Sequence, residues 1–249
     1  MENYCEIMKE YYVSKILIRC DADSDGYPYD IPAVKQLIRD GEMDLSSRVT
    51  FFVGDNATGK STLLEAIAIA AGFNAEGGSK NFNFSARPTE SDLHECVTLV
   101  KHAYEDDGFF YRAESYFNFA SEVDDLGIKK EEYGGVSLHE RSHGEGVLSI
   151  VQGRFRGHGL YLLDEPEAGI SPLRQLTLLM EIHRLVKEGS QFIIATHSPI
   201  LIAYPKAKIY EFDESGIRSI DYKDCELFQI TRDVMTNPES YIRHLLEDE

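Results

Sequence analysis

One nine-residue stretch carries the residue types that hold phosphate groups. It runs from residue 54 to residue 62 and matches the pattern G-x-x-x-x-G-K-[ST]. Its members are Gly54, Asp55, Asn56, Ala57, Thr58, Gly59, Lys60, Ser61 and Thr62. In such a stretch, successive backbone N–H groups surround a polyphosphate, the lysine adds a positive charge, and the serine hydroxyl can ligate Mg²⁺. The expected ligand is a nucleoside triphosphate.

The segments on either side of this stretch have the form that phosphate binding requires. Residues 49–53 are apolar, β-branched and aromatic, which predicts a buried strand, and residues 61–71 predict a helix. A strand, a glycine loop and a helix in this order aim N–H groups and the helix N-terminus at an anion. A glycine turn that matches the pattern by coincidence would need neither flanking element, so we favour the nucleotide site.

Two further strand ends supply acidic and imidazole groups. Residues 160–163 are continuously apolar and are followed by Asp164-Glu165-Pro166, while residues 191–196 form a second apolar run followed by His197. Residues 172–188, which lie between them, show helical periodicity. Alternating helices and buried strands predict a mostly parallel α/β sheet whose carboxyl ends carry the site.

The rest of the chain predicts elements around this sheet. Before the sheet we expect a strand at 12–19 and a helix at 31–40 that closes near Gly41. After the first helix we expect an irregular excursion over the nucleotide at 74–90, strands at 97–103 and 109–114 in a small antiparallel β-layer, and a helical lobe at about 115–150. The last part predicts a hairpin of 209–212 with 217–222 and a helical tail from Cys225. All of these belong to a single predicted domain, residues 1–249.

Composition restricts the class of protein. The formal net charge of -18 does not favour DNA or an anionic membrane as a partner, since such surfaces need clustered Lys and Arg. The four cysteines are scattered without C-x-x-C spacing, which predicts reduced thiols in a cytoplasmic protein. Neither a signal peptide nor an apolar run of membrane-spanning length is found, so no direct membrane insertion is expected.

One acidic segment resembles a calcium loop. Residues 21–26 read D-x-D-x-D-G, but the twelfth position, where such a loop has a bidentate glutamate, is Pro32. We therefore favour an acidic, glycine-broken surface turn over a calcium site.

Taken in order, the motifs resemble those of the ATP-binding cassette (ABC) ATPases, including the heads of SMC and recombination-repair proteins. The chain is most similar to a branch of small stand-alone AAA family ATPases. The matching residues are Phe51-Phe52-Val53-Gly54, Ser142-His143-Gly144-Glu145, Leu163-Asp164-Glu165-Pro166-Glu167-Ala168 and Ala195-Thr196-His197-Ser198-Pro199. The resemblance covers nearly the whole chain and implies a P-loop NTPase fold with an ABC-ATPase-like core, an antiparallel β-layer and a small helical lobe.

The resemblance also assigns roles to residues. Asp164 and Ser61 would hold Mg²⁺, Glu165 would orient or deprotonate the attacking water, and Lys60 and His197 would contact the γ-phosphate of ATP. On its own, Asp164-Glu165-Pro166 also fits a helix-starting turn, and a histidine at a strand end is more often structural.

Residues 142–146 resemble the ABC signature, in which Ser142 and the Gly144 backbone would touch the γ-phosphate held by a second copy. His143 stands where the family has glycine, and Glu145 where it has glutamine. Residues 139–143 also fit H-E-x-x-H, the zinc-protease pattern. The glycines on either side disfavour the continuous helix that zinc binding needs, so we favour the signature.

Two parts of a transporter ATPase are not found. No glutamine occurs between Lys60 and Ser142, and Glu114 or Ser115 is our candidate for its place. The aromatic residue that stacks on adenine is not identifiable either. Both absences disfavour a transporter subunit.

The expected function is that of a Mg²⁺-dependent ATPase whose two copies close head to tail on ATP and act on a separate effector protein, in DNA repair or phage defence. Two alternatives remain open: an ATP-dependent clamp on DNA or protein with little turnover, and the ATP-binding subunit of an ABC transporter.

Overall fold

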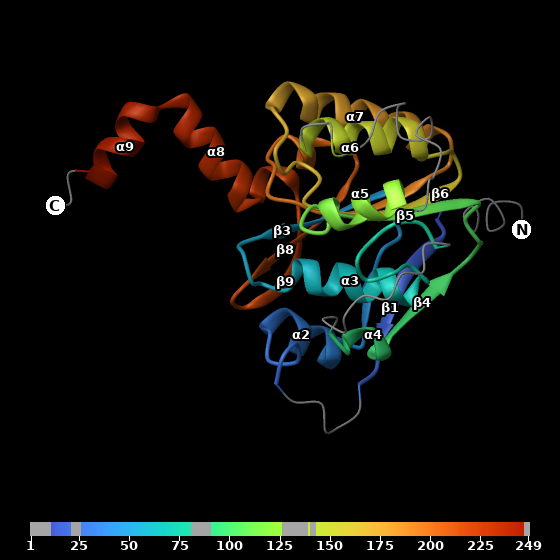
Figure 1. Cartoon of the computed structure of the whole chain (residues 1–249). Coiled ribbons are helices and arrows are strands. Elements are labelled where there is room, and N and C mark those ends of the chain that lie inside the picture. Colours follow the sequence, from blue (N-terminus) through green and yellow to red (C-terminus); the bar gives the residue numbers. More distant parts are fainter. Residues whose placement is uncertain (1–10, 21–25, 81–90, 126–138, 140–142, 247–249) are drawn as a thin grey trace, which may run out of the picture.

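The helix that follows the phosphate loop, α3 (Lys60–Ala70), lies between two β-sheets and contacts both (Figure 1). The structure is a computed structural model and describes residues 11–20, 26–80, 91–125, 139 and 143–246. Its larger sheet has six strands in the order β5-β6-β7-β3-β8-β9, and its smaller sheet has three in the order β2-β1-β4. This arrangement confirms the predicted P-loop α/β fold with a mostly parallel sheet and an antiparallel layer.

The six-stranded sheet is parallel except for one edge strand. Its strands are β5 (Asp107–Arg112), β6 (Gly159–Asp164), β7 (Gln191–Ala195), β3 (Val49–Gly54), β8 (Lys208–Asp213) and β9 (Gly216–Ile220). Only β9 runs antiparallel, as the second strand of the predicted hairpin with β8. Strand β3 pairs with β7 on one side and β8 on the other, so the phosphate loop leaves from the middle of the sheet.

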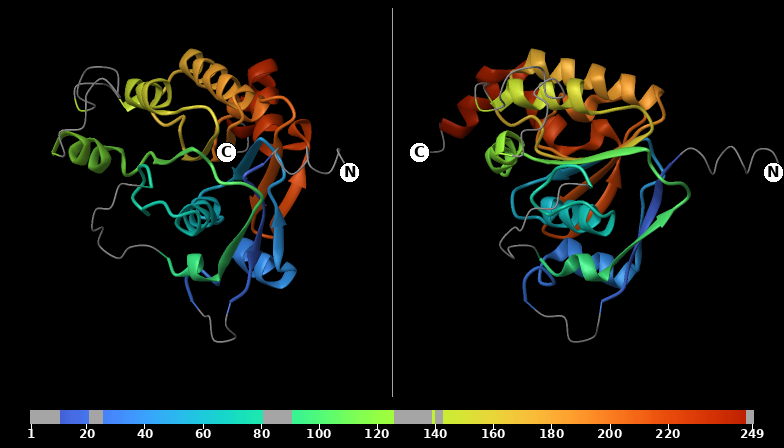
Figure 2. Two further views of the ribbon diagram at one scale, coloured as in Figure 1. Left: turned by 90° about the vertical axis from the view of Figure 1, so that its right-hand side faces the viewer. Right: turned by 45° about the vertical axis from the view of Figure 1, so that its right-hand side comes forward.

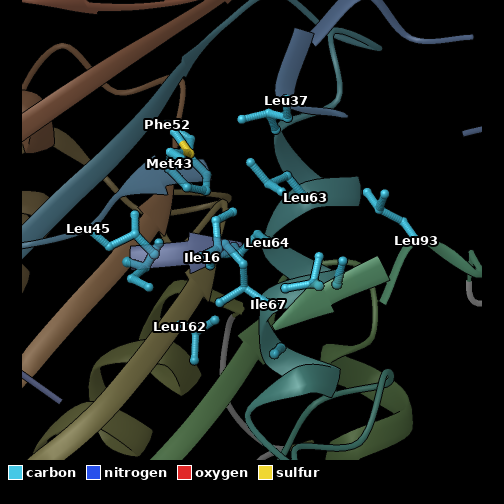
Figure 3. Close-up of a cluster of buried hydrophobic side chains, with 14 of the residues drawn as sticks. Ile16, Leu37, Met43, Leu45, Phe52, Leu63, Leu64, Ile67, Leu93 and Leu162 are labelled. Carbon is cyan, nitrogen blue, oxygen red and sulfur yellow. The ribbon is translucent and has the colours of Figure 1, made fainter. Parts of the chain in front are cut away.

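Helices cover both faces of this sheet, which explains why its central strands are apolar throughout. Phe52 points into a core with α3, whereas Phe51 and Val53 point to the opposite face. That second face packs against α5 (Tyr116–Asp125), α6 (His143–Arg154) and α7 (Pro172–Lys187), which lie together on one side in Figure 2. Figure 3 shows the first core, where Leu63, Leu64 and Ile67 of α3 meet Ile16, Met43 and Leu162.

The three-stranded sheet closes the first core from outside. It consists of β2 (Glu42–Asp44), β1 (Val13–Ile18) and β4 (Val97–Lys101), all antiparallel, together with α2 (Pro32–Asp40) and the short α4 (Leu93–Cys96). Helix α2 has Pro32 in its first turn and is capped by Gly41 just after Asp40, as predicted. The prediction that β4 and β5 share one small layer is wrong, because β4 pairs with β1 while β5 pairs with β6 in the main sheet.

The chain ends in two helices that extend away from the sheets. After the short 3₁₀ turns at Leu201–Ala203 and Tyr222–Asp224, α8 (Glu226–Thr236) and α9 (Pro238–Leu246) form the predicted helical tail (Figure 1). In the described part of the chain, no helix is both long and apolar enough to cross a membrane.

The cysteine prediction needs a correction. Cys20 and Cys96 form a disulfide, whereas the sequence suggested reduced thiols. Cys20 follows β1 and Cys96 precedes β4, and the antiparallel pairing of these strands brings the two Cα atoms to 4.8 Å. Cys225 is buried and free.

The fully buried amide of Gln191 joins the two sheets. Its Oε1 accepts the backbone N–H groups of Tyr12 and Val13 at 3.0 and 2.9 Å. Its Nε2 donates to the carbonyls of Val13, Leu45 and Ser47 at 2.7 to 3.1 Å. One side chain at the start of β7 therefore pairs with backbone groups at the start of β1 and in the segment that joins β2 to β3.

Gln191→Leu should lower the free energy of unfolding by about 3 kcal/mol, because two buried N–H groups lose their acceptor. Urea denaturation monitored by circular dichroism measures this change. The matched control is Gln152→Leu at an exposed position of α6, for which we expect a change below about 0.5 kcal/mol. Equal stability of wild type and Gln191→Leu would contradict the role given to this amide.

Candidate functional site

The phosphate loop has the backbone shape that its glycines permit. Gly54 and Gly59 have φ angles of 130° and 100°, and Ala57 has 62°. A Cβ at Gly54 would lie 2.0 Å from the Phe212 carbonyl oxygen, so only glycine fits where β3 passes β8 into the loop. The loop therefore turns tightly from β3 into α3, with backbone N–H groups available at the start of the helix.

Lys60 is held at the top of this loop. Its Nζ donates to the carbonyl oxygens of Gly54 and Asp55 at 2.8 and 2.6 Å, and only 4% of the residue is exposed. Burial lowers its pKa, against the opposing effect of nearby carboxylates, the strongest being that of Glu165. Among the described residues, this buried ammonium group hydrogen-bonds only to neutral carbonyls, so it is well placed to gain an anionic partner.

A hydrogen bond joins the start of α3 to the end of β6. Ser61 Oγ donates to Asp164 Oδ1 at 2.9 Å. Burial raises the pKa of Asp164 to about 6, although the Ser61 hydrogen bond and the Arg112 charge both act to lower it. The two residues predicted to ligate magnesium are thus in direct contact.

Glu165 and His197 face each other across the ends of two neighbouring strands. Glu165 Oε1 lies 3.7 Å from His197 Nε2, and the Glu165 N–H donates to the Ala195 carbonyl at 2.9 Å. Glu165 has a positive φ of 50°, which turns its side chain out of the strand direction. Burial, followed by the charge of Lys60, lowers the pKa of His197. His197 Nε2 is buried and has no hydrogen-bond partner among the described residues.

The five side chains predicted to act on the terminal phosphate therefore converge. Lys60 and Ser61 begin α3, Asp164 and Glu165 end β6, and His197 follows β7. A pocket of about 230 Å³ lies beside them, lined by Gly54, Asp55 and His197 together with residues of β8 and α8. The contribution of α8 to the lining of this pocket was not predicted, and no local motif in residues 226–231 indicates it.

The signature residues are only partly described. Ser142 lies outside the described residues, as do Glu140 and Arg141 of the H-E-x-x-H pattern. Gly144 lies in the first turn of α6, where a Cβ would come within 2.2 Å of Ile170 Cγ2. Glycine is thus required for α6 to pack against the turn that follows β6. Residues 21–25 of the calcium-like segment also lie outside the described residues.

The two candidates for the place of the transporter glutamine differ in position. Glu114 lines a small cavity with Ser61, Asp164 and Glu165. Ser115 is buried and donates to Glu76 Oε2 at 2.9 Å, outside that cavity. The geometry therefore favours Glu114.

Two residues of the site were missed. Glu167 Oε1 accepts the backbone N–H of His197 at 2.5 Å, which fixes the turn that carries the imidazole. Arg112 is paired with Asp164 in the register of β5 and β6, and its Nε lies 4.0 Å from Asp164 Oδ2. Glu167 lies in a motif that was recognised from the sequence. The position of Arg112 beside Asp164 follows only from the pairing of β5 with β6.

The donor set fits magnesium that arrives with a nucleotide. A hydroxyl and a carboxylate oxygen are hard ligands, and Mg²⁺ is usually bound by one or two such groups plus phosphates and waters. Among the described residues, no group of three or more His, Cys, Asp or Glu side chains is placed to hold a metal ion.

Two family models match overlapping parts of the chain. One, described as "AAA domain", matches residues 31–152, and one described as "AAA domain, putative AbiEii toxin, Type IV TA system" matches residues 102–203. No curated protein matches the chain.

Solved structures share the fold at low sequence identity. A structure described as "an inward-facing conformation of a putative metal-chelate type ABC transporter" has a TM-score of 0.50 and 14% identity, covering 86% of this chain and 85% of that one. The protein cbiO1 from Clostridium perfringens, part of the ABC transporter complex cbiONQ, gives 0.47 and 17%, with 95% and 100% covered. The SMC head domain from Thermotoga maritima gives 0.44 and 13%, with 85% and 100% covered.

Asp164→Asn should stabilise the nucleotide-free protein at pH 8. The folded-state pKa of about 6 lies above the ordinary value of 3.8, so Asp164 stabilises the fold when protonated, and this contribution is lost as pH rises through 6. The shift corresponds to about 3 kcal/mol at pH 8. Asparagine carries no charge, so the variant should gain about that amount at pH 8 and little near pH 4.

Thermal or urea unfolding in EDTA at several pH values tests this expectation. Asp106→Asn, at an exposed position, serves as the control and should change stability by less than about 0.5 kcal/mol. An advantage of Asp164→Asn that is the same at pH 5 and pH 8 would show that charge burial is not its cause.

Proposed function

We propose that the protein, which two AAA-domain family models match and which has a P-loop ATPase fold, binds ATP with Mg²⁺ and hydrolyses it between two copies. The contact between Ser61 and Asp164 carries this proposal, since it joins the phosphate loop to the acidic strand end. A glycine turn with a structural role would not need a buried carboxylate against its first helical hydroxyl.

Each residue of the site would have a definite task. The loop N–H groups and Lys60 would bind the β- and γ-phosphates, while Ser61 and Asp164 would hold the metal, which neutralises charge on the phosphates. Glu165 would orient and deprotonate the attacking water. His197 would donate from its Nε2 to the γ-phosphate, for which its unpartnered nitrogen is suited.

The exposure of the site supports a dimer. About 45% of the Glu165 side chain and 35% of the His197 side chain are exposed, which leaves the water-activating group in contact with bulk solvent. A second copy that contributes Ser142 and the start of α6 would exclude that solvent and strengthen every electrostatic contact inside. ATP would thereby favour the closed pair, and hydrolysis would release it.

The motion would act on a separate effector protein. The second matched family model is described as "AAA domain, putative AbiEii toxin, Type IV TA system", and we propose that the effector acts in phage defence or DNA repair. The likeness to transporter ATPases at 14 to 17% identity concerns the fold and gives no support for transport.

Lys60→Ala should weaken ATP binding by about 100-fold, since one charge-assisted contact to phosphate is lost. Isothermal titration with Mg²⁺ and a non-hydrolysable ATP analogue measures the affinity. Lys187→Ala, at an exposed position of α7, should bind like the wild type. Unchanged affinity of Lys60→Ala would show that the loop does not bind nucleotide.

Glu165→Gln should accumulate a dimer in the presence of Mg²⁺ and ATP, because the water-activating carboxylate is lost while the binding groups remain. Light scattering after size-exclusion chromatography gives the mass. The double variant Lys60→Ala/Glu165→Gln should not respond to ATP. A Glu165→Gln protein with the same mass with and without saturating Mg²⁺ and ATP would contradict the dimer.

A further inference from the structure

Arg112 is a mostly buried cation at the edge of the candidate metal site. It ends β5, directly beside Asp164 in the parallel pairing with β6, and about 13% of its side chain is exposed. Its Nε is buried, has no hydrogen-bond partner among the described residues, and lies 4.0 Å from Asp164 Oδ2. A buried guanidinium that leaves one N–H unused opposite a metal-binding carboxylate needs an explanation beyond packing.

The same guanidinium binds two further carboxylates. Its Nη1 donates to Glu65 Oε2 at 2.5 Å, and its Nη2 is bonded to Glu114. Glu65 lies on α3, one turn after Ser61, and Glu114 lines the cavity that contains Ser61 and Asp164. Arg112 therefore binds one carboxylate oxygen of Glu65 and one of Glu114, and its Nε faces the carboxylate of Asp164.

The backbone fixes the guanidinium in this position. Nη1 also donates to the Ala75 carbonyl at 3.0 Å, and residues 77–78 are held against β5 because Gly78 and Phe110 exchange two backbone hydrogen bonds of 2.8 and 3.0 Å. The planar group is thus bonded at Nη1 and Nη2 and cannot turn away without breaking several hydrogen bonds. Its charge remains beside Asp164 whatever else enters the cavity.

We propose that Arg112 makes metal binding at this site depend on the nucleotide, an inference that rests on the proposed function. Glu114 and Asp164, which line one cavity with Ser61, would otherwise attract a divalent cation on their own, because hard cations take carboxylate oxygens. Arg112 withdraws an oxygen of Glu114 from the metal and repels it from Asp164. The missing ligands and negative charge must then come from the phosphates, so magnesium enters with ATP.

A purely structural ion pair between Arg112 and Glu65 is the competing explanation. Breaking such a pair would lower the stability of the protein, but it would not create affinity for a metal. The two explanations therefore differ in a measurement made without nucleotide.

The test is Mn²⁺ binding to the nucleotide-free protein, followed by electron paramagnetic resonance of the free ion. Arg112→Gln removes the charge, and we expect it to bind Mn²⁺ at least about tenfold more tightly than the wild type. Arg112→Lys keeps a positive charge and should remain close to the wild type. Adding Asp164→Asn to Arg112→Gln should abolish the gain, which places the metal at this site.

Circular dichroism and thermal unfolding establish that each variant is folded. Should Arg112→Gln fail to fold, the double variant Glu65→Gln/Arg112→Gln removes the buried pair as a unit, and it should still bind Mn²⁺ more tightly than the wild type through Asp164 and Glu114. A folded variant without the Arg112 charge that binds Mn²⁺ no better than the wild type overturns the inference. An equal gain in Arg112→Lys overturns it as well.

A parallel titration of the wild type with Mn²⁺ and ATP separates this inference from the proposed function. If the wild type binds Mn²⁺ with ATP and Arg112→Gln gains no affinity without ATP, only the role of Arg112 is wrong. If the wild type does not bind Mn²⁺ with ATP, the proposed function itself fails.

Discussion

The hydrogen bond from Ser61 to Asp164 is the contact on which the rest of the site depends. It fixes the start of α3 against the end of β6, two strands away from β3 in the sheet. The contact is made at a cost, because Asp164 is buried and its pKa is raised to about 6, so the charged carboxylate destabilises the fold near neutral pH. A fold under selection for stability alone would place an apolar side chain there. The unfavourable charge is explained if a cation completes the site, since sequences break such rules mainly at functional positions.

The parallel sheet decides which residues can reach this point. Strands β3, β6 and β7 are neighbours in the same sheet and run in the same direction, so the residues after each strand meet at one edge. The positive φ angles of Gly54 and Glu165 fall at two of these strand ends. They turn the chain sharply where a regular strand would continue and aim the loop and the carboxylate toward one another. Helices on both faces bury the strands up to their ends, so packing on both sides of the sheet supports the contact between Ser61 and Asp164.

Local patterns predicted most of this arrangement, and long-range pairing accounts for the errors. The strand, loop and helix around Lys60 and the strand ends at Asp164 and His197 were predictable because motif and periodicity lie within a few residues of each other. The two strands predicted at 97–103 and 109–114 were placed in one layer, yet β4 pairs with β1, more than 75 residues earlier, and β5 pairs with β6, about 50 residues later. The disulfide between Cys20 and Cys96 depends on the same pairing of β1 with β4. Arg112 and Gln191 were missed for this reason too, since their partners lie on strands that only the fold brings together.

The distribution of charge argues that metal and nucleotide act together at this edge. The chain has a formal charge of -18, and the phosphate loop faces Asp164 and Glu165, with Glu167 close behind. Burial raises the pKa of Glu167 and lowers that of Lys60, so the interior around the loop disfavours any single uncompensated charge. A triphosphate placed here without a metal would meet carboxylates across the loop, and in the described part of the chain Lys60, Arg112 and backbone N–H groups would offset the repulsion. A divalent cation held by Asp164 would convert that repulsion into attraction. The same carboxylates that disfavour a free anion thus favour its magnesium complex.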